Sequence, residues 1–106
     1  DERYFLYYED NDICRRIRLD GRKIIYAPKA VLWHKNAGSA GGSGSPLQDY
    51  YISRNRMLFG FSYAPLRTKV ALIRESLRIF SSGRQWQKRG ALDFYLRRFG
   101  KGSYKV

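Results

Sequence analysis

The chain has 106 residues, enough for one small domain with a single modest core. A composition of 43% hydrophobic and 28% charged residues excludes disordered and collagen-like proteins, and a single cysteine excludes an internal disulfide. The formal net charge of +12 is unevenly spread: residues 1–53 carry 8 basic and 7 acidic side chains, and residues 54–106 carry 13 basic and 2 acidic ones. The second half therefore presents a cationic surface that attracts the phosphates of nucleic acids or anionic lipids.

The first half of the chain predicts one helix and two short strands. Residues 3–8 (RYFLYY) predict a short buried strand or approach segment, and apolar residues at helical spacing predict a helix over about 11–20. A strand is expected at 22–27 (RKIIYA), just before a proline, and a second strand is expected at 30–34 (AVLWH). The stretch 37–45 (AGSAGGSGS) predicts a loop, because glycine and serine cannot fill a core.

The second half predicts helices. Ser45, Pro46 and Gln48 form a capping box, which predicts a helix start at this point. Pro65 predicts the start of a second helix, whose apolar stripe has spacings of 4, 3, 4 and 3 and consists of Leu66, Val70, Ile73, Leu77 and Phe80. Three arginines lie about a quarter turn from that stripe: Arg67, Arg74 and Arg78. A last short helix is expected over 91–99.

The acidic cluster of Glu9, Asp10 and Asp12 is the first candidate site. Like charges this close raise carboxyl pKa values and a helix amino terminus lowers them, so one carboxylate can serve as a general base. The alternative is ordinary helix capping with solvated carboxylates. Asp10 and Asp12 also form an Asp-X-Asp pattern, which can bind a divalent metal but is a weak signal by itself.

Three further residues are candidates for ligand contacts. His34 is the only histidine and lies beside the glycine-rich stretch, so it is either a metal ligand or a partly buried residue at a strand end. Trp33, next to it, is a sugar platform or a core residue. Arg54 falls on the apolar face of its helix, where it needs an anionic partner: a carboxylate of this chain or a phosphate of a ligand.

The basic and aromatic second half suits three kinds of surface. Apolar stripes flanked by Arg67, Arg74 and Arg78 fit a helix that lies on a membrane surface. Basic and aromatic groups together also fit nucleic-acid binding, although no zinc-finger or Walker spacing supports it. The third interpretation is a solvated basic face on a packed helical hairpin.

Two stretches carry a resemblance to a known family. The run DERYFLYYEDNDICRRIRLDGRKIIYAPKAVLWHK resembles the catalytic C-terminal part of family-two glycosyltransferases with the GT-A fold. The stretch SPLQDYYISRNRMLF is similar to the next helix of that family, with its Tyr-x-x-Arg-Asn pattern at Tyr51, Arg54 and Asn55. The ending RGALDFYLRRFGKG resembles the C-terminal tails of its rhamnosyltransferase-like and galactofuranosyltransferase-like members.

The resemblance implies roles for individual residues. Glu9 and Asp10 would be the family's Glu-Asp pair, with Asp10 as the general base for the acceptor hydroxyl. His34 would join the site of a manganese or magnesium ion. Arg54 and Asn55 would contact substrate, with phosphate as the expected partner, and Asp12 would be a helix-start residue rather than half of the nucleotide-metal motif.

The resemblance also implies an architecture. The fold class would be α/β, a C-terminal fragment of a GT-A fold, with a catalytic segment over 1–45 and a helical, basic C-terminal extension over 46–106. The family's nucleotide-binding half has no counterpart in the chain. A fragment of this kind is expected to be inactive alone and to associate with itself through exposed apolar surface.

The expected function is transfer of a hexose from a nucleotide-sugar donor to a glycan or lipid-linked acceptor by an inverting, metal-assisted mechanism. The resemblance implies a cytoplasmic enzyme of cell-envelope polysaccharide biosynthesis, peripheral to the inner face of the membrane and bound to its anionic surface. The alternative is a small basic module without catalysis that binds a membrane surface or nucleic acid, of which nucleic acid is the less favoured partner.

Overall fold

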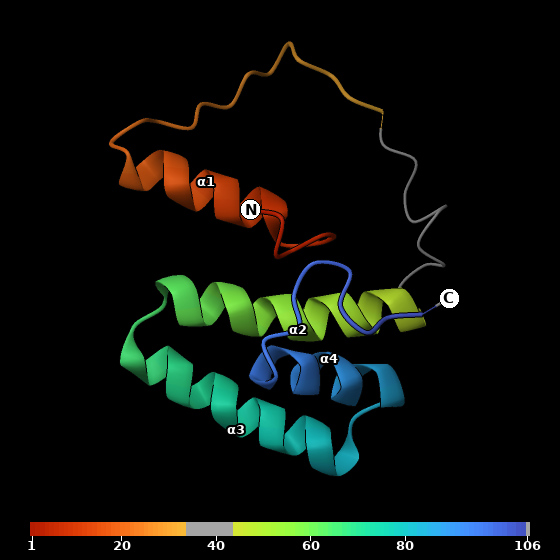
Figure 1. The fold of residues 1–106 in the computed structure, drawn as a ribbon. Helices are drawn as coiled ribbons and strands as arrows, with labels where there is room; N and C mark the ends of the chain where they lie inside the picture. Colours follow the sequence, from red (N-terminus) through yellow and green to blue (C-terminus); the bar gives the residue numbers. More distant parts are fainter. Residues whose placement is uncertain (34–43, 106) are drawn as a thin grey trace.

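The computed structural model describes residues 1–33 and 44–105, and these residues form four helices (Figure 1). In chain order they are α1 (Glu9–Leu19), α2 (Pro46–Tyr63), α3 (Leu66–Ser82) and α4 (Gln85–Tyr95). Helices α2, α3 and α4 pack together, and α1 lies along the other side of α2 (Figure 1). The segment after α4 turns back over α2.

The predicted start of α2 is confirmed. The hydroxyl of Ser45 accepts a hydrogen bond from the backbone N–H of Gln48 at 3.3 Å, and Pro46 occupies the first turn. The side-chain oxygen of Gln48 accepts a hydrogen bond from the backbone N–H of Gly44 at 2.6 Å. The helix ends at Tyr63, just before the residue that precedes Pro65, because a residue before proline is disfavoured in helical conformation.

The core lies between α2 and α4. Gly90 on α4 meets the backbone of α2 so closely that an added Cβ would stand 2.2 Å from the carbonyl oxygen of Tyr50. Tyr50, Met57 and Leu58 of α2 and Ala91 of α4 are buried. The bounds predicted for the last helix, 91–99, are wrong, because α4 starts at Gln85 and ends at Tyr95.

Helix α3 covers the core with a different face from its apolar stripe. Ser76 and Ile79 are its buried residues, and Leu72 packs against Gly60 of α2. The predicted stripe lies outward, where Leu66 is 77% and Leu77 is 61% exposed. The structure thus leaves an amphipathic face of α3 without a partner in the described part of the chain.

The predicted α/β class is wrong, because residues 1–33 and 44–105 contain helices and no strand. Residues 22–27 and 30–33 are extended but unpaired, with Tyr26 and Leu32 each 85% exposed. A strand requires a neighbouring backbone to complete its hydrogen bonds, and no described segment provides one here. The last residue of the second predicted strand, His34, and most of the predicted loop over 37–45 lie outside the described residues.

The segment over 3–8 is also not a strand. It is an irregular turn in which Phe5, Tyr7 and Tyr8 all have positive φ angles, at 62°, 67° and 71°. The helix predicted over 11–20 begins directly after this turn, at Glu9.

None of the helices in the described part of the chain is long and apolar enough to span a membrane.

Candidate functional site

The candidate general base lies at the amino end of α1. Glu9 and Asp10 are both exposed in the first turn of the helix, where the helix dipole favours negative charge. One oxygen of Asp10 accepts hydrogen bonds from the backbone N–H of Asn11 at 2.7 Å and from its side-chain amide at 3.0 Å. The carboxylate is therefore oriented by its neighbour and remains open to solvent.

The turn that leads into this helix is conformationally costly. Phe5, Tyr7 and Tyr8 occupy the left-handed region, which costs a residue with a side chain about 1–2 kcal/mol. Tyr8 is the residue before the helix, and its side chain provides no cap. A turn of this kind persists only where surrounding groups hold it, and such turns are found at functional sites.

The amide of Asn55 on α2 holds the turn. Its two N–H groups are shared among three carbonyl oxygens, which lie 2.9 Å (Tyr4), 2.7 Å (Leu6) and 2.9 Å (Tyr7) from the amide nitrogen. Asn55 is fully buried, so water does not compete for these bonds at its side chain. The left-handed conformation directs these carbonyls toward one side chain, which compensates for its cost.

Arg54, the neighbour of Asn55, is likewise fully buried and donates every one of its guanidinium N–H groups. Nε donates to the Asn55 side-chain oxygen at 2.9 Å. Nη2 donates to the carbonyls of Arg3 at 3.1 Å and Tyr4 at 2.9 Å, and Nη1 donates to those of Arg98 at 3.3 Å and Gly100 at 2.7 Å. Arg54 and Asn55, called the clamp below, thus join both ends of the chain to α2.

The charge of Arg54 is met by backbone dipoles and aromatic rings. The guanidinium lies 5.5 Å from the ring centre of Tyr50 and 5.1 Å from that of Tyr51. Burial lowers the pKa of Arg54 below its ordinary value, but an arginine stays protonated at neutral pH. All N–H donors of Arg54 are engaged within the chain, so none is free to bind a substrate. The substrate contact predicted for the clamp stays a prediction.

Asp12 attaches α1 to α2 from inside the protein. Its carboxylate accepts hydrogen bonds from the hydroxyls of Tyr63 at 2.6 Å and Tyr4 at 3.4 Å and from Arg16 at 2.8 Å. Burial would raise the pKa of Asp12, but the hydrogen bonds from Tyr63 and Arg16 outweigh it and hold that pKa below its ordinary value. Asp12 is therefore a structural anion, whereas Asp10 two residues earlier is exposed.

The described residues offer no ready metal centre. No group of three or more histidine, cysteine, aspartate or glutamate side chains within 1–33 and 44–105 is arranged to hold an ion. Asp12 is already bonded through both oxygens, so the Asp-X-Asp pattern does not present two open carboxylates. The predicted ligand His34 lies outside the described residues.

The remaining predicted residues lie apart from the clamp. Trp33 is 92% exposed at the end of the extended segment. Arg67, Arg74 and Arg78 lie on exposed positions of α3, and Arg78 pairs with Glu75 at 2.7 Å. The structure thus connects Glu9 and Asp10 with the clamp through the turn over 3–8, and it places the three arginines beside an exposed apolar stripe.

Sequence reasoning missed the partners of the clamp. The position of Arg54 on an apolar face showed that it needed acceptors, but carbonyls carry no sequence signal. It also missed a basic cavity on the outer face of α4. Gln85, Lys88, Arg89 and Leu92 share one helical face there, a spacing that the sequence contains.

No family model, no curated protein and no solved structure matches this chain.

Proposed function

We propose that the chain belongs to a glycosyltransferase that uses a nucleotide-sugar donor, with Asp10 as the general base. The observation that carries the proposal is the exposed Glu9–Asp10 pair, which directly follows a left-handed turn held by the buried clamp. Strained, internally fixed backbone next to an open carboxylate is typical of a catalytic position. The ordered resemblance of the chain to family-two enzymes supplies the reaction class.

In the proposed reaction, Asp10 accepts the proton of the acceptor hydroxyl as the oxygen attacks the anomeric carbon. The bond from that carbon to the donor's diphosphate oxygen breaks, the nucleoside diphosphate leaves, and the configuration at the carbon inverts. Glu9 is the other member of the proposed pair and lies exposed beside the base in the first turn of α1. The acceptor is a glycan or a lipid-linked sugar.

The proposal includes a manganese or magnesium ion, and His34 is the one residue of this chain that is expected to bind it. The described residues do not form a ligand set for it, so no step is assigned to the ion here. The clamp's contribution is to fix the backbone from which the base projects, because a misplacement of about 1 Å costs roughly 100-fold in rate.

The test is Asp10→Asn in the intact protein that carries this chain. Transfer from a panel of nucleotide sugars, followed as release of nucleoside diphosphate, should fall by about 10²–10⁴-fold while donor binding is kept. Asp20→Asn is the matched control, because Asp20 is an exposed aspartate just after α1. Full activity of the Asp10→Asn enzyme would remove Asp10 from this role.

The outward face of α3 supports a second proposal: association with the anionic inner face of the cell membrane. Val70 and Ile73 are each 40% exposed between Leu66 and Leu77, so an apolar stripe runs along the helix toward solvent. Basic side chains flank a stripe of this kind in helices that lie flat in the interface. Each arginine near such a surface contributes about 1 kcal/mol of attraction.

Vesicle flotation tests this attachment. The chain should float with vesicles of phosphatidylglycerol and should not float with vesicles of phosphatidylcholine. Arg67→Gln with Arg74→Gln should weaken flotation about 10-fold or more, whereas Arg18→Gln with Arg22→Gln, an equal loss of charge elsewhere, should change it much less. Equal binding to both vesicle types, or salt-sensitive binding to DNA without vesicle binding, would contradict the membrane proposal.

A further inference from the structure

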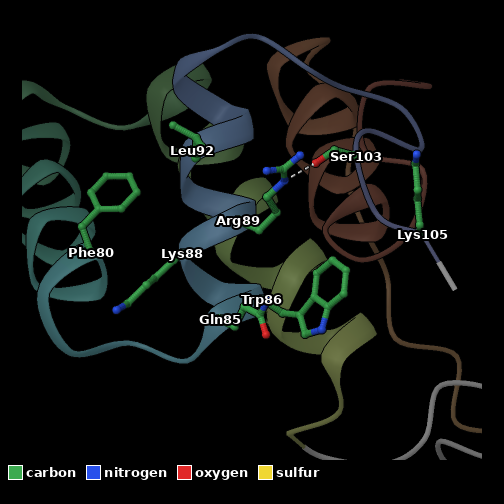
Figure 2. A pocket seen from close by; sticks show the side chains of 8 residues that line it. All are labelled: Phe80, Gln85, Trp86, Lys88, Arg89, Leu92, Ser103 and Lys105. Atoms are coloured by element: carbon green, nitrogen blue, oxygen red, sulfur yellow. Dashed lines mark hydrogen bonds between the residues drawn. The ribbon is translucent and has the colours of Figure 1, made fainter.

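A cavity of about 810 Å³ opens on the outer face of α4 (Figure 2), and neither Glu9 nor Asp10 lines it. It lies between the end of α3, the exposed face of α4 and the segment that follows α4. Its lining includes six aromatic, aliphatic and basic residues: Phe80, Trp86, Lys88, Arg89, Leu92 and Lys105. A pocket of this size is in the range that accommodates a small ligand.

The charged groups of the cavity are all cationic. Lys88, Arg89 and Lys105 line it, and no aspartate or glutamate is among its lining residues. Neither lysine's ammonium group has a hydrogen bond or ion pair to another residue within 1–33 and 44–105. Two free ammonium groups and a guanidinium around one cavity favour an anion, above all a phosphate.

The guanidinium of Arg89 is held in place. Its Nε donates a hydrogen bond to the hydroxyl of Ser103 at 2.8 Å, and Figure 2 shows this bond at the cavity. Ser103 in turn donates to the buried carboxylate of Asp93, which also accepts a hydrogen bond from Tyr50 at 2.5 Å. This chain of bonds connects the cavity to the core, so Arg89 presents its other N–H groups from a fixed position.

The remaining walls are apolar. Phe80 is 36% and Leu92 is 38% exposed, although both are large hydrophobic side chains. Trp86 packs on Tyr104 with the ring centres 4.8 Å apart, so the indole forms a rigid wall. A small free anion leaves this apolar surface in contact with water, whereas a ligand with a hydrocarbon part covers it.

We propose that this cavity binds a single molecule of a phosphorylated lipid. The phosphate binds the guanidinium of Arg89, with Lys88 and Lys105 adding positive charge on either side of it (Figure 2), and the first part of the hydrocarbon chain contacts Phe80 and Leu92. The site is separate from the proposed base, and it takes an individual lipid rather than a flat bilayer surface. The inference therefore goes beyond sugar transfer and does not depend on it.

Dodecyl phosphate is the probe, used below its micelle-forming concentration. The starting protein carries Trp33→Phe, which leaves Trp86 as the only tryptophan and its fluorescence as a reporter in the cavity wall. Titration should give a saturable change in Trp86 emission. Circular dichroism of each variant confirms that the helices are kept.

The charge requirement is tested with paired variants. Lys88→Gln with Lys105→Gln should weaken dodecyl phosphate binding about 10- to 30-fold, because each lysine contributes roughly a five-fold attraction. Lys69→Gln with Lys101→Gln removes the same charge outside the cavity and should change the affinity less than about two-fold. Equal weakening by both pairs would overturn the proposed site in favour of general charge attraction.

Two further probes separate the phosphate from the hydrocarbon. Inorganic phosphate and dodecanol should each bind at least 10-fold more weakly than dodecyl phosphate. Inorganic phosphate binding as tightly would assign the cavity to a free phosphate, and dodecanol binding as tightly would make the cations irrelevant; either result overturns the proposal. Because the readout is binding, failure here leaves the Asp10→Asn test of sugar transfer untouched.

Discussion

Replacing Asn55 by alanine removes the amide that holds the left-handed turn in front of α1, and we expect a loss of about 2–4 kcal/mol in the free energy of unfolding. The buried Nε of Arg54 would lose its acceptor, which costs about 1–3 kcal/mol for an unsatisfied buried group. The carbonyls of Leu6 and Tyr7 would lose a donor but are partly within reach of water, so each adds about 0.5 kcal/mol. Tyr4 keeps its bond from Arg54.

Urea unfolding followed by circular dichroism measures the global loss. Hydrogen exchange measures where it occurs, and the amides of α1 should lose more protection than those of α2 and α4. The reason is that α1 is held through the turn, through Asp12 and through the contact of Tyr8 with Phe59, whereas α2 and α4 bury each other. Gln85→Ala, at an exposed amide, is the control and should cost less than about 0.5 kcal/mol.

Two results would refute this reasoning. A loss no larger than that of the control would show that the three carbonyls do not depend on Asn55. A large global loss with unchanged relative protection of α1 would show that the amide supports the α2–α4 core rather than the turn.

Three further predictions concern acid stability and packing. The pKa of Asp12 lies below its ordinary value in the folded protein. The stabilisation from this carboxylate is therefore present above about pH 4 and is lost as the pH falls further. In urea unfolding, the Asp12→Asn protein should lose less stability between pH 6 and pH 3 than the parent protein. Gly90→Ala, which places a Cβ 2.2 Å from an α2 carbonyl, should cost about 2–3 kcal/mol, against about 1 kcal/mol for Gly21→Ala, where only the φ of 75° opposes the side chain. Ile79→Ala should cost about 2–4 kcal/mol and Leu77→Ala less than about 0.5 kcal/mol; the reverse order in thermal or urea unfolding would mean that α3 packs through its other face.

The start of α2 and the break between α2 and α3 could be predicted because their causes are local, whereas the bounds of α4 were predicted wrongly. Ser45 and Pro46 cap and start α2 whatever the rest of the chain does, and Pro65 separates α2 from α3. The face of α2 that carries Tyr50, Arg54 and Leu58 was likewise apparent from spacing, and these side chains are buried.

The prediction of strands at 22–27 and 30–34 failed for a physical reason. An apolar run such as 22–27 has the composition of a strand, but a strand exists only where a second backbone lies beside it. In the described part of the chain no backbone does, and Ile25 remains 81% exposed. Composition reports what a segment prefers to bury, not what lies near it.

For the whole protein, too, the sequence and the tertiary structure determine different features. The sequence by itself determined the helices, the basic second half and the acidic start of α1, because capping, periodicity and charge act within a few residues. Only the tertiary structure decided that Arg54 and Asn55 bind backbone carbonyls, that the stripe of α3 faces outward and that a basic cavity forms beside α4. These features depend on groups far apart in the chain, and the closeness of such groups is set by how the helices pack.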